Sequence, residues 1–218
     1  SHKFVARKGC ELTGLDFNKA KVITCHLGNG SSITAVDGGK SIDTSMGFTP
    51  LEGLIMGTRT GDIDPSIVTF LKEKEGWTAT QTNDFLNKKC GLLGLYGPSS
   101  DCRDIENAVL QGDKRANLAQ HAFAYRVLKY IGAYTAAMNG ADLIVFTGGI
   151  GENDTVIRQI IGTRLGFLGV SFDQEKNKTV HGKNAILSTN GTRTRVVVIS
   201  TDEELVIATD TFNLTNHK

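Results

Sequence analysis

Three short β-rich runs, separated by turn signals, occupy residues 21–44. They read VITCH, SSITAV and SIDTS. Asn29-Gly30 and Asp37-Gly38 stand between them, and such pairs between β-rich runs are the strongest short-range hairpin signals. The pattern therefore predicts an antiparallel meander of three strands with glycines at its bends.

A long irregular stretch and two helices are expected next. Residues 45–64 contain too many turn formers for one regular element, which predicts a long ordered loop or a loop with a short helix. Asp64-Pro65 begins a helix that stops at Gly76, with proline at its favoured first position. Thr78, followed by Gln81, predicts a capping box for a second helix that ends near Cys90-Gly91.

The second half of the chain alternates helices and strands. Apolar residues recur every three or four positions across 104–139, which predicts helix. The run ADLIVF at 141–146 and the run RVVVIS at 195–200 are apolar without alternation, as in strands covered on both faces. Thr201 and Glu204 predict a capping box for a final helix. Hairpins first and strand–helix units afterwards predict a layered α/β domain.

Two glycine clusters carry the candidate chemistry. Residues 21–66 combine glycine turns, small hydroxyl residues and one arginine, Arg59. A second cluster, TGGIGEN at 147–153, follows an apolar run and precedes a predicted helix closed by Gly166. Backbone N–H groups approach phosphate closely where no side chain intervenes. Two such loops in one chain favour a nucleotide held from two sides.

Composition narrows the class of protein. The 218 residues carry a net charge of +1 and 39% hydrophobic residues, which fits a soluble globular protein of one large or two small domains. Basic and acidic residues nearly balance, without basic runs interleaved with aromatics, which argues against nucleic acid as a partner.

The apolar runs are too short to span a bilayer, and no cleavable signal segment is visible. Four cysteines without a CxxC pair indicate small buried residues in a reducing cytoplasm.

Three common motifs are excluded. The string DGGKS lacks the first glycine of a P-loop, because position 34 is threonine, and it joins two predicted strands. The dinucleotide fingerprint fails too, since Ile33 and Asp154 stand where its third glycine belongs. No GxSxG string is present, which removes the simplest serine-hydrolase motif.

The whole chain resembles the C-terminal part of the acetate kinase family, within the superfamily of sugar kinases, actin and heat-shock ATPase domains. The resemblance rests on long strings in the family's order: SHKFV, HLGNGSSITAVDGGKSIDTSMGFTPLEGLIMGTRTGDIDP, SSDCRDI, FTGGIGEN and TDEEL. It implies a ribonuclease-H-like α/β domain with a mixed five-stranded sheet and helices on both faces. Residues 1–218 then form the single C-terminal nucleotide-binding domain of a two-domain kinase.

The resemblance also implies site residues. Arg59 matches the catalytic arginine, His2 matches the second histidine of a catalytic block, Pro50 falls in the small-acid pocket, and Glu203 faces Mg²⁺. Cys102 stands where the family has an aromatic residue. The positions that match nucleotide contacts are His26, Leu27, Gly28, Asn29, Gly30, Asp101, Cys102, Arg103, Gly149, Ile150, Gly151, Glu152 and Asn153.

Several of these residues also have a structural interpretation. Arg59 is then a loop arginine bound to Asp62 or Asp64. The bend at 28–30 is a plain hairpin turn, and His26 is a packed strand-end residue. Asp101 with Arg103 forms an N-cap pair, and 149–153 is a strand-to-helix turn. Glu203 is an acid in the first turn of a helix, favoured by the helix dipole.

The implied reaction is reversible transfer of the ATP γ-phosphoryl group to acetate with Mg²⁺, in a homodimer joined through region 115–139. The chain opens on Ser1-His2-Lys3 in the middle of a family motif, so we expect a fragment that lacks the N-terminal domain and is inactive alone. Propionate or butyrate kinase is one alternative, and a noncatalytic nucleotide-binding and dimerisation module is another. An actin-like filament former is disfavoured, since segment 51–65 has no purpose there.

Overall fold

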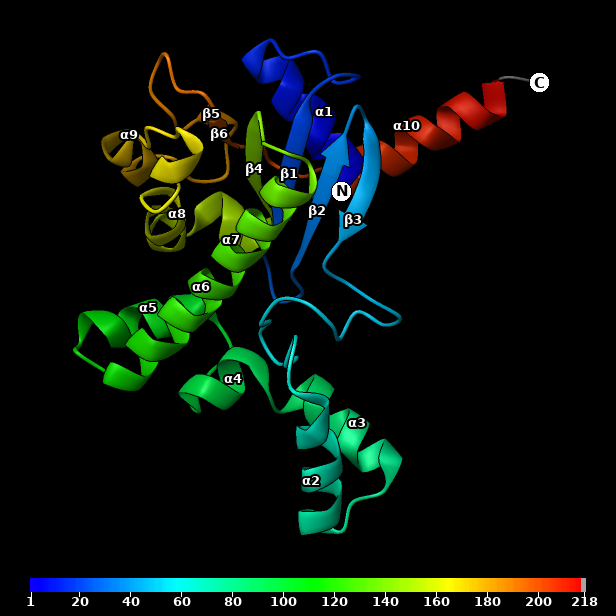
Figure 1. Cartoon of the computed structure of the whole chain (residues 1–218), viewed down its shortest axis with the longest axis vertical. Helices are drawn as coiled ribbons and strands as arrows, with labels where there is room; N and C mark the ends of the chain where they lie inside the picture. The colour runs from blue at the N-terminus through cyan, green and yellow to red at the C-terminus, as the bar shows by residue number, and fades with distance from the viewer. Residues whose placement is uncertain (217–218) are drawn as a thin grey trace.

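The computed structural model describes residues 1–216, and Figure 1 shows one mixed sheet between helices, with the last helix extending away from it. The sheet has the strand order β3-β2-β1-β4-β6-β5 among these residues. In that last helix, α10 (Glu203–Asn216), some side chains lie outside the description, namely those of residues 203, 205, 206, 209, 210, 213 and 216.

The predicted meander is confirmed. Strands β1 (Lys21–His26), β2 (Ser32–Asp37) and β3 (Lys40–Thr44) pair antiparallel in sequence order. Strands β4 (Leu143–Thr147) and β6 (Arg195–Val198) extend the sheet in parallel to β1. These five strands are the ones that the ribonuclease-H-like prediction requires.

The expected strand number was wrong by one. A sixth strand, β5 (Ala185–Ile186), pairs antiparallel with β6 at the edge of the sheet. It has two residues, which is too short to leave a periodic pattern in the sequence. The α/β fold class with ribonuclease-H-like topology is otherwise confirmed.

Side chains of the central strands alternate between two cores. Val22, Leu143 and Val197 face one side, where they pack with Val5 and Cys10 of α1 (His2–Thr13). The neighbouring residues on each strand face the opposite side, under the long helix α6 (Lys114–Ala137); they are Ile23, Ile144, Phe146, Val196 and Val198. The lack of alternation in the sequence therefore reflects cover on both faces, as predicted.

Helix ends agree well with the predicted caps. Asp64 caps α2 (Pro65–Glu75), which ends at Gly76 in the left-handed conformation. Thr78 and Gln81 form both halves of a capping box at α3 (Ala79–Lys88). The remaining helices are α4 (Gly91–Tyr96), α5 (Cys102–Leu110), α7 (Gly148–Asn153), α8 (Thr155–Gly162), η1 (Gly166–Leu168) and α9 (Gln174–Lys178).

Several local expectations were wrong. Helix α1 and the short α4 were not expected, and the glycine cluster at 148–153 is a short helix instead of a loop. Helix α8 ends at Gly162 and not at Gly166. The capping box of Thr201 is not formed: α10 begins at Glu203, and the buried Thr201 hydroxyl has no hydrogen-bond partner among the described residues.

Two helical glycines give a matched test of the packing. A Cβ on Gly162 would lie 2.4 Å from ring carbons of Phe172, whereas a Cβ on Gly132 would meet nothing within 4 Å. We expect Gly162→Ala to lower the free energy of unfolding by about 1–3 kcal/mol through overpacking. Gly132→Ala should raise it by about 0.5–1 kcal/mol, because alanine favours the helix. Urea unfolding measures both, and equal effects of the two substitutions would contradict the packing described.

Candidate nucleotide site

The register of two parallel strands brings the two glycine clusters together. His26 at the end of β1 pairs with Thr147 at the end of β4, so both bends leave the same edge of the sheet. The next residue, buried Leu27, joins them through its backbone. Its N–H donates to the carbonyl of Thr147 at 2.8 Å, and its carbonyl accepts from the N–H groups of Ile150 at 2.9 Å and Gly151 at 3.2 Å.

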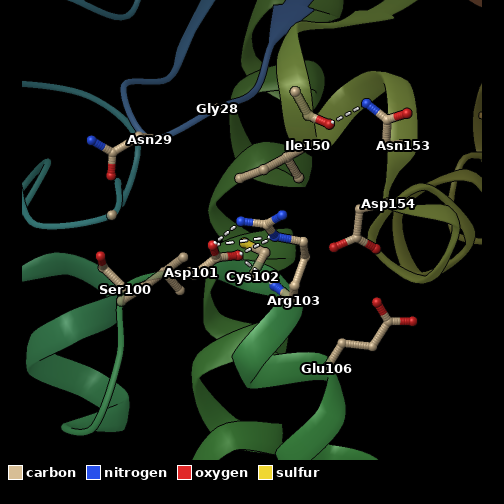
Figure 2. Close-up of a pocket in the computed structure, with 13 residues that line it drawn as sticks. Gly28, Asn29, Ser100, Asp101, Cys102, Arg103, Glu106, Ile150, Asn153 and Asp154 are labelled. Carbon is tan, nitrogen blue, oxygen red and sulfur yellow. Dashed lines mark hydrogen bonds and ion pairs between the residues drawn. The ribbon is translucent and has the colours of Figure 1, made fainter. Parts of the chain in front are cut away.

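Both bends face one cavity of about 570 Å³, a volume within the range of small-molecule sites. Figure 2 shows Gly28 and Asn29 on one side of it, Asp154 and Glu106 on the other, and Asp101 with Arg103 between. The lining residues are Gly28, Asn29, Gly57, Leu92, Ser100, Asp101, Cys102, Arg103, Glu106, Gly149, Ile150, Asn153 and Asp154.

The first bend is a hairpin turn, as its structural interpretation required, and it also lines the cavity. Ser31 fixes it, since its hydroxyl accepts from the N–H of Gly28 at 3.1 Å and donates to the carbonyl of Gly28 at 2.9 Å. A Cβ on Gly28 would stand 4.0 Å from the nitrogen of Gly149. A side chain at position 28 would therefore just reach the main chain of the second bend.

The loop that carries Arg59 packs against this bend. The N–H of Gly57 donates to the carbonyl of Asn29 at 3.0 Å, and a Cβ on Gly57 would collide with the Asn29 side chain. Arg59 is half-buried, and one of its terminal nitrogens lies 3.7 Å from the Cβ position of Gly30. The guanidinium thus stands beside the Gly28–Gly30 bend, next to the cavity.

Arg59 does not bind the acids that its structural interpretation named. Its Nη1 donates to the carbonyl of exposed Pro50 at 3.3 Å. Asp64 caps α2 by accepting from Ser66. Asp62 accepts from Tyr130 at 2.7 Å and pairs with Arg126 at 3.3 Å. The loop arginine is therefore left without a carboxylate partner among the described residues.

Asp62 anchors the Arg59 loop to α6. One carboxylate oxygen accepts from the N–H of Gly53 at 2.8 Å, which closes the loop on itself. The other oxygen accepts from Tyr130 and Arg126 on α6. Burial, and next the hydrogen bond to Asp62, raise the pKa of Tyr130, so its hydroxyl remains a donor at neutral pH.

Asp101 and Arg103 line the cavity as a mutual ion pair. Arg103 Nη2 donates to Asp101 Oδ2 at 2.6 Å, and Asp101 caps α5 by accepting from the N–H of Arg103. These hydrogen bonds lower the pKa of Asp101 to about 2. Burial raises the pKa of the neighbouring Cys102 to about 12, which leaves a neutral thiol. The N-cap interpretation is confirmed, and both charged side chains still face the cavity.

Helix α7 contributes only part of its predicted residues to the cavity. Gly149, Ile150 and Asn153 line it, whereas Gly151 and Glu152 do not. Gly151 is buried. The Glu152 carboxylate turns back to accept from the N–H of Gly148 and from the N–H of Thr201, both at 3.0 Å. Glu152 therefore joins the start of α7 to the segment that leads into α10.

A second cavity of about 480 Å³ shares Gly149 with the first. His26, Asp202 and Glu204 also line it, so one histidine and two acidic residues border this cavity. The metal prediction for Glu203 lies outside the described residues, because its side chain is not described. Among the described side chains, no three histidine, cysteine or acidic groups are clustered for metal binding.

His2 lies beside His26, with ring centroids 6.2 Å apart. Its Nδ1 is hydrogen-bonded to the Thr24 hydroxyl at 2.7 Å and its Nε2 to the Ser32 hydroxyl at 2.8 Å. Burial, followed by the nearby His26, lowers the pKa of His2 to about 4. Both ring nitrogens are therefore engaged by neighbouring hydroxyls, and the ring is neutral at pH 7.

Sequence reasoning missed part of the lining, namely Gly57, Leu92, Ser100, Glu106 and Asp154. Ser100 and Asp154 directly follow or precede predicted positions, and Gly57 lies two residues before Arg59, so their loops offered a signal. Glu106 offered none, because the packing of α5 places it. Among the described residues, no helix is long and apolar enough to cross a membrane.

Asp154 gives a pH-dependent test of this end of the cavity. Burial, together with nearby Glu106, raises its pKa to about 6 from 3.8, although Arg158 and the Ile157 N–H oppose the shift. The folded chain therefore holds this proton more tightly than the unfolded chain, and stability falls as pH rises from 4 to 6. Asp154→Asn keeps an oxygen for the Ile157 N–H and cannot ionise.

We expect Asp154→Asn to raise the free energy of unfolding at pH 7 by about 1–3 kcal/mol and to change it little at pH 4. Urea unfolding at the two pH values measures the difference. Asp113→Asn, at the exposed N-cap of α6, controls for loss of a capping charge. A gain for Asp154→Asn that is equal at both pH values would contradict the assignment.

The chain matches the family model described as the acetokinase family over residues 1–209. It is 59% identical to the acetate kinase of Carboxydothermus hydrogenoformans over all 218 residues, which cover 54% of that relative. The crystal structure of Porphyromonas gingivalis acetate kinase superposes with a TM-score of 0.96 at 47% identity, over 99% of this chain and 54% of that one.

A propionate kinase from Francisella tularensis subsp. tularensis is also similar, with a TM-score of 0.87 at 45% identity over 95% of this chain and 52% of that one. The chain thus spans about half the length of the curated relatives it matches. The family model covers nearly the whole of the sequence. The chain belongs to the acetokinase family.

Proposed function

We propose that this chain is the nucleotide-binding part of an acetate kinase, whose full-length form transfers the γ-phosphoryl group of ATP to acetate and reverses the reaction from acetyl phosphate. The observation that carries the proposal is the single cavity shared by the bends at 28–30 and 149–153. Their register and the backbone hydrogen bonds of Leu27 support a ligand held from both sides.

Phosphates would lie at the end of the cavity formed by Gly28, Asn29 and Gly57. Phosphoryl transfer demands positioning and charge neutralisation more than covalent chemistry. Arg59 suits that role, because it stands beside Gly30 and has no carboxylate to neutralise it among the described residues. Its planar fork can donate to two phosphoryl oxygens at once.

The ribose and base would lie along α5 and α7. Asp101 and Arg103 offer an acceptor and donors, and Ile150 offers an apolar surface to the base. Cys102 is the smaller replacement for the family's aromatic residue, and its neutral thiol packs at the same wall. Gly151 and Glu152 would act by holding this wall in place, not by contact with the nucleotide.

Mg²⁺ would lie at the second cavity, next to the segment that carries Glu203, which remains the predicted metal residue. Asp202 and Glu204 line this cavity beside His26, and Mg²⁺ prefers a few carboxylate oxygens completed by phosphate and water. The bound ion would supply neutralisation of the phosphate charge during transfer. Glu152 would hold the acidic segment near the bends, because it accepts from the N–H of Thr201. His2, whose ring lies beside His26, remains a predicted catalytic residue.

Acetate is the acid we propose, with propionate or butyrate as the alternatives. Curated relatives at 54–60% identity are acetate kinases, whereas one similar structure is a propionate kinase. Pro50 lies against Arg59, so the acid would bind where the loop 45–64 reaches the phosphate end.

A homodimer through region 115–139 also remains a proposal, as does a cytoplasmic location. Eight of the 24 residues of α6 are buried, whereas Leu118 and Tyr125 of α6 and Leu110 of α5 are exposed. Exposed apolar side chains of this kind could contribute to a contact surface. The second candidate function is a noncatalytic module for nucleotide binding and dimerisation. It is favoured because all residues that line the cavity belong to this 218-residue chain.

Gly149→Val tests the cavity directly. A Cβ on Gly149 would meet no atom within 4 Å, so the fold should tolerate the change while the new side chain enters the space for the nucleotide. We expect ADP affinity of the 218-residue chain to fall by at least roughly tenfold, with an unchanged unfolding midpoint. Calorimetric titration measures the affinity. Equal affinity of both forms would contradict nucleotide binding between the bends.

Activity separates the two candidate functions. We expect the full-length protein to form acetyl phosphate from ATP and acetate, and the 218-residue chain alone to form none. Arg59→Ala in the full-length protein should lower kcat by roughly a thousandfold, as loss of an arginine at a transferring phosphoryl group does. Arg164→Ala, at an exposed position, is the control. Full-length protein that binds ADP without turnover would favour the noncatalytic module instead.

A further inference from the structure

Arg158 is a fully buried arginine that no part of the proposed reaction uses. It lies on α8 with 0% exposure and forms no ion pair with any described residue. Burial lowers its pKa to about 10, so the guanidinium is still charged at neutral pH. A buried charge costs stability unless its donors are satisfied, and here backbone and amide oxygens satisfy them.

The guanidinium joins three segments behind the cavity wall. Its Nη1 donates to the carbonyl of Gly151 in α7 at 3.0 Å, its Nε to the side-chain oxygen of Asn177 in α9 at 2.9 Å, and its Nη2 to the carbonyl of Val180 at 2.6 Å. Arginine spreads its donors over three nitrogens in a planar fork, so it can reach three separated acceptors, whereas lysine has one nitrogen for all of its donors.

Gly151 is the link between this cluster and the cavity. Its N–H donates to the carbonyl of Leu27, the residue before the first bend, and its carbonyl accepts from Arg158. Two hydrogen bonds therefore fix the peptide groups of Gly151, one to Leu27 and one from Arg158. Its neighbours Ile150 and Asn153 line the cavity, so the position of Gly151 sets the position of that wall.

Helix α9 and the segment after it form further hydrogen bonds with α7 and with the first residue of α8. The N–H of Gly182 donates to the carbonyl of Glu152 at 3.2 Å, and His181 contacts the carbonyl of Asn153 at 3.1 Å. Asn177 in turn donates to the carbonyl of Thr155 at 2.8 Å. Arg158 fixes Asn177 and Val180, and through them the residues that support the end of α7.

We propose that Arg158 is a positioning residue for nucleotide binding, which holds α7 so that Ile150 and Asn153 face the base and ribose. The inference rests on the proposed function of the cavity. It predicts an effect confined to the nucleoside end, because Arg158 makes no contact with the Gly28–Gly30 bend. Pyrophosphate, which would use the phosphate end alone, should therefore bind almost independently of Arg158.

The test compares ADP and pyrophosphate binding to the 218-residue chain by calorimetry. We expect Arg158→Met, which keeps the apolar stem, to weaken ADP binding by roughly tenfold or more and pyrophosphate binding by less than about twofold. Arg158→Lys keeps the charge but carries its three donors on a single nitrogen, so its effect on ADP affinity should lie between those of wild type and Arg158→Met. Arg164→Met, at an exposed position, is the control. Hydrogen exchange should rise in 148–154 and 177–182 in the Arg158→Met and Arg158→Lys chains, and stay unchanged in 21–37.

Each outcome decides the inference. Unchanged ADP affinity in a folded Arg158→Met or Arg158→Lys chain overturns it. An equal loss for ADP and pyrophosphate also overturns it, because that result indicates a general loss of structure. If Arg158→Met does not fold, the Arg158→Lys chain decides by the same criteria. A wild-type chain that binds neither ligand overturns the proposed function itself, and the inference with it.

Discussion

The parallel pairing of β1 with β4 is the constraint on which the site depends. The last residues of the two strands, His26 and Thr147, pair with each other. The two bends that follow them therefore start at the same edge of the sheet, although some 120 residues of sequence separate them. The backbone of Leu27 then joins them with three hydrogen bonds. Ligand sites outside the carboxyl ends of parallel strands are a general consequence of such sheets, and here the two cores on either side keep the strands in place.

Close approach of main chain explains the glycines in the site. Gly148 has a φ of 76°, and a Cβ there would lie 2.7 Å from the carbonyl of Leu27. A Cβ on Gly57 would require the Asn29 side chain to move. Gly149 differs, because a Cβ would meet only the cavity. Steric contact with the main chain therefore requires glycine at 148, the Asn29 side chain limits the space at 57, and a side chain at 149 would enter the cavity.

Local chemistry made much of this structure predictable. The meander followed from Asn29-Gly30 and Asp37-Gly38, and the α3 capping box from Thr78 and Gln81, because each signal lies within a few residues. The family resemblance supplied Arg59, Asp101 and Arg103. Contacts between distant segments left no signal: Asp62 with Tyr130, Glu152 with Thr201, and Arg158 with Val180 depend on the packing of helices. The capping box at Thr201 failed for the same reason, since Glu152 engages the Thr201 backbone.

The central claim is that both bends hold one polyanion at once. Amide hydrogen exchange of the 218-residue chain, with and without saturating ADP, tests it most directly because the two bends give separate peptides. The account predicts slower exchange in 27–31 and in 148–154 together, with little change in α2. Protection of one bend alone, or protection of neither while ADP is bound, would contradict it.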